Sequence, residues 1–363
     1  MEEQFGYREI VGRFQVTGEF VECVRYGEGH INDTFKVTTE ENGKETHYIL
    51  QRINSRLFPD VAKLMHNIEL VTEFCRRSVL ARGGDPQREC LTLIRTKDGN
   101  AYCHDGNDDY RMYVFIERAT TYQSVREPRD FYESAVAFGN FANLLADFDA
   151  SQLYEVLPDF HNTKVRYANF GTAVQKDVCG RAKEVRAEIE WVKAHSGLCG
   201  KIVDAIERKE IPLRVTHNDT KLNNVMLDDE TGKGIAVIDL DTVMPGSLCY
   251  DFGDSIRFGC NCAAEDEPDT EKVHFVFDLY KTYLEGYLSA VGKGITQREK
   301  ELLPWGAVLM TYECGMRFLT DYLEGDTYFK IHREKHNLDR ARTQFKLVDE
   351  MLACFDKMQA AVT

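Results

Sequence analysis

The sequence predicts an α+β protein of two lobes, a small N-terminal lobe rich in strands and a larger C-terminal lobe made mainly of helices. Short alternating apolar and polar segments, separated by glycine-containing turns, occupy the first third of the chain. From residue 129 onward, apolar residues recur every three or four positions, which is the period of a helix with one buried face. With 363 residues and 43% hydrophobic content, the chain can form two compact units. We place the domain boundary at this change of pattern, giving residues 1–117 and 118–363.

Four segments of the first lobe are rich in β-branched and aromatic residues, as strands are. They cover residues 20–26, 34–39, 48–53 and 110–117. Asn42-Gly43 predicts a tight hairpin turn between two of them, and Asp98-Gly99 predicts a second hairpin. A helix is expected over about residues 59–77.

The second lobe begins with a helix that carries an apolar stripe. The stripe consists of Phe131, Ala135, Phe138, Ala142 and Leu145. Thr296 and Glu299 have the spacing of a capping box and predict the start of another long helix. A last helix is predicted by the apolar stripe that runs from Leu338 to Leu352.

Composition argues against several classes of partner and location. The formal net charge is −15, from 45 basic and 60 acidic residues, and no block is rich in lysine or arginine. Nucleic acid and anionic membranes are therefore not expected as partners. No apolar stretch approaches the roughly 20 residues of a membrane-spanning helix, and the first residues do not resemble a signal peptide. Eleven scattered cysteines without a C-x-x-C pair fit a reducing cytoplasm.

The stretch HNDTKLNN is the most informative part of the chain. It spaces four polar residues as H-x-D-x-K-x-x-N, namely His217, Asp219, Lys221 and Asn224. Protein kinases show this spacing in their catalytic loop. A buried core segment does not need these side chains, and a solvated turn does not need their spacing.

An apolar hairpin follows the loop and ends in acidic residues. Its second arm, IAVIDLD, delivers Asp239 to the end at which the first arm starts after Asn224. Folding the hairpin would bring Asp219, Asn224 and Asp239 together, and oxygen ligands of this kind suit Mg²⁺ bound to a nucleotide. In phosphoryl transfer, Asp219 would accept the proton of the acceptor hydroxyl, Lys221 would face the γ-phosphate and His217 would brace the loop.

A second acidic candidate lies in the literal string Asp251-Phe252-Gly253, which copies the metal-binding tripeptide of protein kinases. PGSLCY precedes it rather than an apolar strand. We therefore expect Asp239 to hold the metal and Asp251 to brace the catalytic loop or to cap the following helix.

Six segments together resemble the aminoglycoside phosphotransferase/choline kinase superfamily. Three of them are VTHNDTKLNNVMLD, VIDLDTVMPG and YDFGDSIRFG. With GEGHINDTF and YILQRIN near the N-terminus and RFLTDYLEGDTYF near the C-terminus, the chain is most similar to the bacterial N-acetylhexosamine 1-kinases. The catalytic loop alone specifies only the superfamily.

The resemblance implies a two-lobed protein-kinase-like fold, with a nucleotide-binding N-terminal lobe and a catalytic, substrate-binding C-terminal lobe. It implies transfer of the ATP γ-phosphate to the C1 hydroxyl of GlcNAc or GalNAc, with ATP and Mg²⁺ as cofactors. Asp219 would be the general base and would also bind the sugar. His30, Arg317 and Tyr328 match positions that contact the sugar in the relatives.

On the nucleotide side, the turn YGEGHIND offers Gly27 and Gly29, which let the backbone approach phosphate. Two glycines in a turn are also what an ordinary hairpin needs. The segment from Phe115 to Glu117 would frame adenine with its backbone groups, although it equally suits a buried strand.

The strand YILQRI lacks the lysine that clamps phosphate in kinases. Arg52 is the natural substitute, and Gln51, on the opposite strand face, is the alternative. Glu69 in the following helix is a possible partner for Arg52, although it suits a solvated helix face at least as well. On the acceptor side, Arg317 requires a partner, which is either Asp321, four residues later, or a ligand.

Two other functions remain open. Another small-molecule kinase would act on an aminoglycoside, choline, homoserine or a different sugar, but an arginine and a tyrosine on the acceptor side favour a neutral, hydroxyl-rich substrate. A pseudokinase would be expected to lack the base or the metal ligands, which are present. The sequence does not distinguish GlcNAc from GalNAc, and it does not fix the oligomeric state or the extent of lobe closure.

Overall fold

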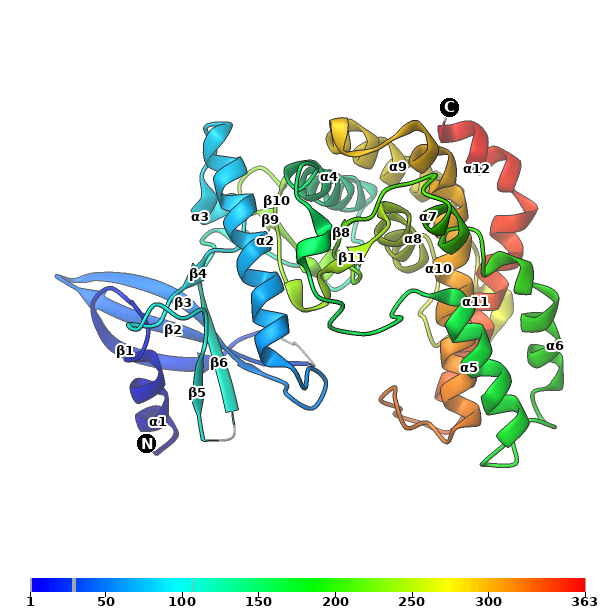
Figure 1. Ribbon diagram of the computed structural model, residues 1–363, viewed down its shortest axis with the longest axis horizontal. Coiled ribbons are helices and arrows are strands. Elements are labelled where there is room, and N and C mark those ends of the chain that lie inside the picture. Colours follow the sequence, from blue (N-terminus) through cyan, green and yellow to red (C-terminus); the bar gives the residue numbers. More distant parts are fainter. Residues whose placement is uncertain (1, 28–30, 107, 363) are drawn as a thin grey trace. The chain divides into compact units, whose positions relative to one another are not determined.

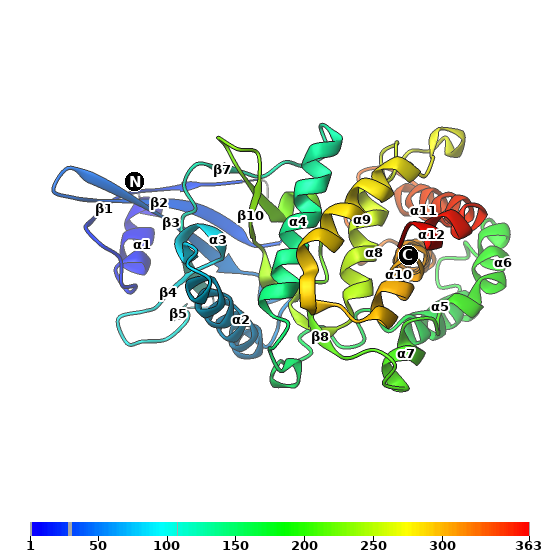
Figure 2. The ribbon, with the colours of Figure 1, turned by 90° about the horizontal axis from the view of Figure 1, so that it is seen from above.

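The computed structural model describes residues 2–27, 31–106 and 108–362 and is shown in Figure 1 and Figure 2. It contains two compact units, each assembled from three segments and each described here by itself. The first unit comprises Met1–Thr120, Gln152–Leu157 and Met226–Met244. The second comprises Thr121–Ser151, Pro158–Val225 and Pro245–Thr363. The sequence predicts one boundary after residue 117, whereas the compact units interleave along the chain.

An antiparallel sheet of six strands dominates the first unit, with spatial order β1-β2-β3-β6-β4 and with β5 also paired to β6. The strands are β1 (Glu19–Arg25), β2 (Asp33–Glu41), β3 (Lys44–Ile53), β4 (Leu93–Ile94), β5 (Cys103–Asp105) and β6 (Asp108–Val114). The four predicted long strands are therefore confirmed, with ends shifted by a few residues.

Both predicted turns exist, but only one joins paired strands. Asn42 and Gly43 have φ of 55° and 78° between β2 and β3, which is the left-handed geometry that two-residue hairpins favour. At the second turn, Gly99 has φ 86°. The segments on its two sides, β4 and β5, each pair with β6 rather than with each other.

One hydrophobic cluster of the first unit lies on one face of this sheet. It is formed by Ile10, Val11, Phe14, Cys23, Phe35, Val37, Tyr48, Leu50, Tyr110 and Met112. The helices of this unit are α1 (Glu2–Val11), α2 (Val61–Ala81) and α3 (Pro86–Glu89). Helix α1 lies beside β1 (Figure 1), and α2 begins where the side chain of Asp60 accepts a hydrogen bond from the Lys63 N–H.

The apolar hairpin after the catalytic loop forms as predicted. Strands β9 (Val225–Asp228) and β10 (Gly234–Val237) pair, and β7 (Ala119–Thr120) pairs with β9. A short helical turn over Leu240–Thr242 follows β10.

Helices make up most of the second unit, and α10 is the longest of them. They are α4 (Pro128–Leu144), α5 (Thr163–Lys176), α6 (Arg186–Ala194), α7 (Val203–Glu207), α8 (Leu248–Gly259), α9 (Phe277–Val291), α10 (Gln297–Leu323), α11 (His336–Ala353) and α12 (Phe355–Val362). Helix α10 packs against α5, α8, α11 and α12, while α4 and α9 lie side by side (Figure 2). The short strands β8 (Arg214–Thr216) and β11 (Met244–Gly246) complete the set.

Glycines allow α8 and α10 to approach closely. A Cβ on Gly253 would lie 2.2 Å from the backbone oxygen of Gly306, and a Cβ on Gly306 would lie 2.2 Å from that of Cys249. Any larger residue at either position would push the two helices apart. The position of α8 is therefore fixed by backbone contact.

The start of α10 confirms the predicted capping box. The Thr296 side chain accepts from the Glu299 N–H at 3.1 Å, and the Glu299 carboxylate accepts from the Thr296 N–H at 2.7 Å. The same carboxylate, fully buried, accepts two hydrogen bonds from Arg214 at 3.1 Å. This cap therefore ties α10 to the strand that precedes the catalytic loop.

All eleven cysteines lie within the described residues and are free thiols. Among the helices of the described ranges, none combines the length and the apolar character that crossing a membrane requires.

Candidate active site

The HNDTKLNN loop follows β8, and the side chain of His217 anchors its start. This side chain is fully buried, and its ring packs edge-on against Phe138 and Phe141 of α4, at centroid distances of 5.5 and 6.0 Å. The Asp219 N–H donates to its Nδ1 at 3.3 Å. His217 therefore contacts both α4 and the loop backbone, as its predicted bracing role requires.

The three remaining motif residues are in mutual contact. Asp219 forms an ion pair with Lys221 (Oδ1 to Nζ, 2.8 Å). The Asn224 amide nitrogen donates to the Asp219 backbone oxygen at 2.8 Å and to its Oδ2 at 3.2 Å. Burial alone would lower the pKa of Lys221, but the charges of Asp219 and Asp254 outweigh it and raise that pKa. The loop therefore presents a carboxylate beside a fully charged ammonium group.

Helix α8 clamps this loop through its first turns. The Asp251 carboxylate accepts the backbone N–H groups of His217 and Asn218, both at 2.8 Å. One turn later, Asp254 accepts the Thr220 N–H at 3.0 Å. Asn218 sits at φ 65°, in the left-handed region, a conformation that persists only where surrounding contacts enforce it.

The pKa values of the two acids of α8 are shifted in opposite directions. Burial raises the pKa of Asp251 to about 6, although the charge of His217 and the two backbone N–H groups oppose this rise. Burial also opposes ionisation of Asp254, but the charges of Arg257 and Lys221 keep its pKa below the usual range. Asp251 thus braces the catalytic loop, as we expected. Asp254, which the sequence did not suggest, also accepts a hydrogen bond from the loop backbone.

In the first unit, Asp239 follows β10 with φ 61° and ψ 63°, which is a costly conformation for a residue other than glycine. Two residues later, Asp241 is buried and forms an ion pair with Arg111 of β6 (Oδ1 to Nη2, 2.5 Å). Its Oδ2 accepts from the Asn32 side chain at 2.6 Å. The buried acid after β10 is thus Asp241, beside the predicted metal ligand Asp239.

The candidates on β3 point to different partners. Arg52 is exposed and binds Asp33, with Nε to Oδ2 at 3.0 Å, and Asp108 at 3.4 Å. Gln51 instead accepts from the Arg111 Nε at 2.9 Å and donates to the Thr34 hydroxyl at 3.0 Å.

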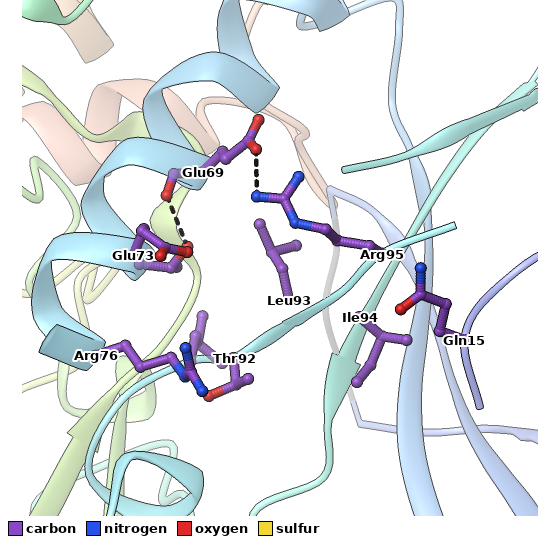
Figure 3. A pocket seen from close by; sticks show the side chains of 10 residues that line it. Gln15, Glu69, Glu73, Arg76, Thr92, Leu93, Ile94 and Arg95 are labelled. Carbon is purple, nitrogen blue, oxygen red and sulfur yellow. Dashed lines mark hydrogen bonds and ion pairs between the residues drawn. The ribbon is translucent and has the colours of Figure 1, made fainter. Parts of the chain in front are cut away.

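Of the two alternatives for Glu69, the pairing with Arg52 does not form. Glu69 of α2 forms its ion pair with Arg95, at 2.6 Å (Figure 3). Both residues line a cavity of about 360 Å³ between α2 and the segment around β4. Arg52 and Glu69 therefore each form an ion pair with a different residue.

The other nucleotide-side candidates are only partly described. Gly27 has φ 73°, and no atom of the described residues lies within 4 Å of a Cβ built on it, while Gly29 and His30 lie outside the described residues. The Phe115 N–H donates to the backbone oxygen of His47 at 3.2 Å, and the Glu117 carbonyl accepts from Arg88. Two of the backbone groups predicted to frame adenine therefore have partners within the unit.

Arg317 of α10 lies among aromatic rings. Its guanidinium carbon is 5.2 Å from the centroid of Phe160, 5.7 Å from that of Tyr328 and 5.4 Å from that of Phe329. Among the described residues, no ion pair or hydrogen bond of Arg317 is found. Asp321 is not its partner, because that carboxylate accepts the backbone N–H groups of residues 327, 328 and 329.

A second arginine, Arg166 of α5, lies on the same aromatic ring. Its guanidinium carbon is 5.9 Å from the Phe160 centroid, and it donates to the Phe160 backbone oxygen at 3.0 and 3.2 Å. Burial and the charge of Arg317 lower the pKa of Arg166. The nearest buried acid, Glu313, is occupied by His161 at 2.8 Å and by the Thr163 hydroxyl at 2.5 Å. The two guanidinium groups thus lie near two carboxylates, those of Glu313 and Asp159, which both act to raise the pKa of Arg166.

Three polar residues described above, one in the first unit and two in the second, escaped the sequence analysis. A signal existed for Arg111, because it is the only charged residue in an otherwise apolar and aromatic stretch of β6, YRMYV. Asp254 follows Asp251 by three residues, one helical turn, in YDFGDS. Arg166 gave no signal, since an arginine in an amphipathic helix is ordinarily solvated.

Comparison with known proteins gives a family match and a fold match. The model of the family described as "Phosphotransferase enzyme family" matches residues 22–274, more than half of the chain. An aminoglycoside phosphotransferase from Alicyclobacillus acidocaldarius is similar in structure, with a TM-score of 0.61, 12% identity and coverage of 98% of this chain and 95% of that one.

Two further solved structures are similar. A choline kinase from Cryptosporidium parvum has a TM-score of 0.56 and 16% identity, covering 93% and 90% of the two chains. A microcompartment-associated aminopropanol kinase has a TM-score of 0.59 and 13% identity, covering 99% of each. At these identities the likeness shows the fold, and it confirms the predicted α+β, kinase-like class.

Proposed function

The chain belongs to the phosphotransferase enzyme family, and from this premise we propose that it transfers the γ-phosphate of ATP to the C1 hydroxyl of an N-acetylhexosamine, GlcNAc or GalNAc. The product would be the sugar 1-phosphate. The cluster of Asp219, Lys221 and Asn224 carries the proposal, because it combines a proton acceptor, a cation and an amide on one clamped loop.

In the proposed reaction, Asp219 accepts the proton of the sugar hydroxyl as that oxygen attacks the γ-phosphate. Lys221 stabilises negative charge on the transferring group, and His217 keeps the loop in place. Phosphoryl transfer depends mainly on such positioning and charge stabilisation, because little covalent chemistry is left to the protein.

Asn224 and Asp239 are the proposed ligands of Mg²⁺, which neutralises phosphate charge when bound. The Asn224 amide nitrogen is used by Asp219, so its carbonyl oxygen is the atom that it can offer to a cation. Oxygen ligands from one or two side chains, completed by phosphate and water, are typical of Mg²⁺ sites. Gly27, Gly29, Arg52, Phe115 and Glu117 remain proposed contacts of the nucleotide.

The hydrogen-bond donors around Phe160 favour a neutral, hydroxyl-rich acceptor. Arg166 and Arg317 lie on the same ring, and a guanidinium group can only donate hydrogen bonds. Sugar hydroxyls accept such hydrogen bonds, whereas the cationic nitrogen of choline, an amino-alcohol or an aminoglycoside does not. Tyr328 and the neighbouring rings offer apolar faces for a sugar ring. Arg317, Tyr328 and His30 are therefore the proposed sugar contacts.

An acceptor screen tests the proposal. Purified protein with ATP and Mg²⁺ is offered N-acetylhexosamines, hexoses, choline, homoserine and aminoglycosides, and both ADP release and phosphorylated product are measured. We expect turnover of an N-acetylhexosamine, with phosphate on C1. Asp219→Asn should reduce the rate by about 10²–10⁴-fold, the usual contribution of a general base, while leaving nucleotide binding intact.

Turnover of an amine without turnover of any N-acetylhexosamine would contradict the sugar assignment and leave phosphoryl transfer standing. No transfer to any acceptor, with equal ATP binding by wild type and the Asp219→Asn variant, would favour a nucleotide-binding pseudokinase instead.

A further inference from the structure

The first unit contains a buried arginine that has no role in the proposed reaction so far. Arg111 is among its largest fully buried side chains, with 1% of the side chain exposed. Its Nη2 forms the ion pair with Asp241, and its Nε donates to Gln51 at 2.9 Å. The Nη1 atom is buried and has no hydrogen-bond partner among the described residues. The guanidinium group is thus held by two partners, and one of its nitrogen atoms has no hydrogen-bond acceptor among the described residues.

Asp241 connects this cation to a second polar contact. Its other carboxylate oxygen accepts from Asn32 at 2.6 Å, and the Asn32 amide oxygen accepts the Asn54 N–H at 3.0 Å. The polar network therefore joins the segment before β2, the strands β3 and β6, and the turn after β10. Polar networks of this kind fix one arrangement of the elements that they join.

The turn held in this way is the one that carries Asp239. Asp239 has a left-handed backbone conformation, directly before the short helical turn that contains Asp241. Burial opposes the charged form of Arg111, but Asp241 and, more weakly, Asp239 outweigh it and raise its pKa. Arg111 is therefore charged and acts electrostatically on both acids.

A buried ion pair is a poor device for stability alone. Desolvation of the two charges costs as much as, or more than, their attraction returns, and well-packed apolar residues of similar size are often at least as stable. The pair between Arg111 and Asp241 therefore calls for a role in positioning. The strand that carries the phosphate-clamping lysine in kinases has no lysine after Lys44 here, and its Arg52 is exposed and bound to Asp33.

We propose that Arg111, acting through Asp241, is the positioning residue that holds Asp239 ready for the divalent cation of the nucleotide. Arg111 lies on β6, one strand further along the sheet than β3, the strand on which kinases carry their lysine. The inference rests on the proposed function only in requiring a nucleotide-bound cation, and not in the identity of the acceptor.

Binding of Mn²⁺ in the presence of a non-hydrolysable ATP analogue, followed by electron paramagnetic resonance, tests this without any turnover. The variant Arg111→Met/Asp241→Asn removes both charges, so no unpaired charge is left buried and folding should persist. We expect its dissociation constant for Mn²⁺ to rise by about 10–100-fold, as when residues that support a metal ligand are removed. Arg111→Lys keeps the positive charge but loses the planar guanidinium group with its several donors, and it should reduce Mn²⁺ affinity by less.

The matched control is Arg95→Met/Glu69→Gln, which removes another arginine–carboxylate pair of the same unit and should change Mn²⁺ affinity by less than about twofold. Thermal unfolding confirms that each variant is folded. Should the double charge variant fail to fold, Arg111→Lys alone decides: unchanged Mn²⁺ affinity in a folded Arg111→Lys protein contradicts the proposal.

Other outcomes separate this inference from the sugar kinase proposal. Wild-type Mn²⁺ affinity in the folded double charge variant overturns the inference, as does a loss seen only on Arg52→Met. If wild type binds Mn²⁺ with nucleotide in an Arg111-dependent way but phosphorylates no N-acetylhexosamine, the inference stands and the sugar kinase proposal fails. Absence of any Mn²⁺–nucleotide binding by wild type overturns both.

Discussion

Asp251 shows how one buried carboxylate organises the candidate catalytic loop. Its two oxygens accept the consecutive backbone N–H groups of His217 and Asn218. Only the ionised form is an acceptor at both oxygens without restriction, since the protonated form turns one oxygen into a donor. Because burial raises the pKa of this group to about 6, the loop loses part of its support in mildly acidic solution.

The first prediction is a pH dependence of turnover. In the folded protein, Asp251 is mostly protonated below about pH 6 and mostly ionised at pH 7, so kcat should rise as the pH increases through about 6. Asp251→Asn places an amide N–H against a backbone N–H and should lower kcat at pH 7 while removing this part of the profile. Identical acidic limbs in the pH–rate profiles of wild type and variant would show that another group is responsible.

Arg317 is a residue whose surroundings point to a ligand. It lies among three aromatic rings and lacks an ion pair among the described residues. Hydrogen bonds from a charged donor are worth about 1.5–3 kcal/mol. Arg317→Ala should therefore raise KM for the sugar by about 10–100-fold and leave KM for ATP nearly unchanged.

Arg340→Ala is the matched control for that measurement, because Arg340 also contacts an aromatic ring, Phe318, from a neighbouring helix. A general loss of packing would affect both variants alike. Equal changes in KM for sugar and for ATP in Arg317→Ala would contradict a sugar contact.

At the scale of elements, α10 and α8 set the geometry of the second unit's site. Helix α10 carries Glu313 and Arg317, and its backbone meets that of α8 at Gly306 and Gly253. Helix α8 in turn holds the loop. The capping box of α10 adds a direct tie to β8 through Glu299 and Arg214.

Two substitutions at this cap should differ in cost. Thr296→Ala removes one cap hydrogen bond and should lower the free energy of unfolding by about 1 kcal/mol. Glu299→Ala should cost more, because it also leaves Arg214 without its carboxylate. Gln297→Ala, at an exposed position of the same turn, should change stability by less than about 0.5 kcal/mol. Urea denaturation measures all three, and equal effects of Thr296→Ala and Glu299→Ala would contradict the tie to β8.

At the scale of the whole molecule, the chain crosses between its two compact units within the hairpin region. Asp219 and Asn224 belong to the second unit, whereas Asp239, one hairpin later, belongs to the first. The prediction that Asn224 and Asp239 share one Mg²⁺ ion therefore stays a prediction about how the two units work together.

Double-mutant analysis tests this prediction. Asn224→Ala and Asp239→Ala should each weaken Mn²⁺ binding in the presence of an ATP analogue, and Asp239→Ala should do so more strongly because it removes a charge. If both residues bind the same ion, the double variant should lose less than the sum of the two effects, since residues that share a partner are not additive. Strict additivity would place them at independent sites.

Local patterns were sufficient for the elements and for the core of the motif. The alternation of β1, β2, β3 and β6, the Asn42-Gly43 turn and the capping box of α10 depend on neighbours within a few residues, and each formed as predicted. The contacts of Asp219 with Lys221 and Asn224 are local in the same sense. A single sequence contains all the information that such short-range structure requires.

The partners of the charged residues were decided only by the tertiary structure. In the sheet register, Arg52 lies opposite Asp33 on one side and Tyr110 on the other, while Gln51 lies opposite Arg111. Strand order sets these neighbours, and the same order pairs β4 and β5 with β6 rather than with each other. The sequence by itself therefore determined which elements and which reactive loop this protein has. Which cation meets which acid, Arg111 with Asp241 and Arg95 with Glu69, followed from side chains brought together across strands and helices that are distant in the chain.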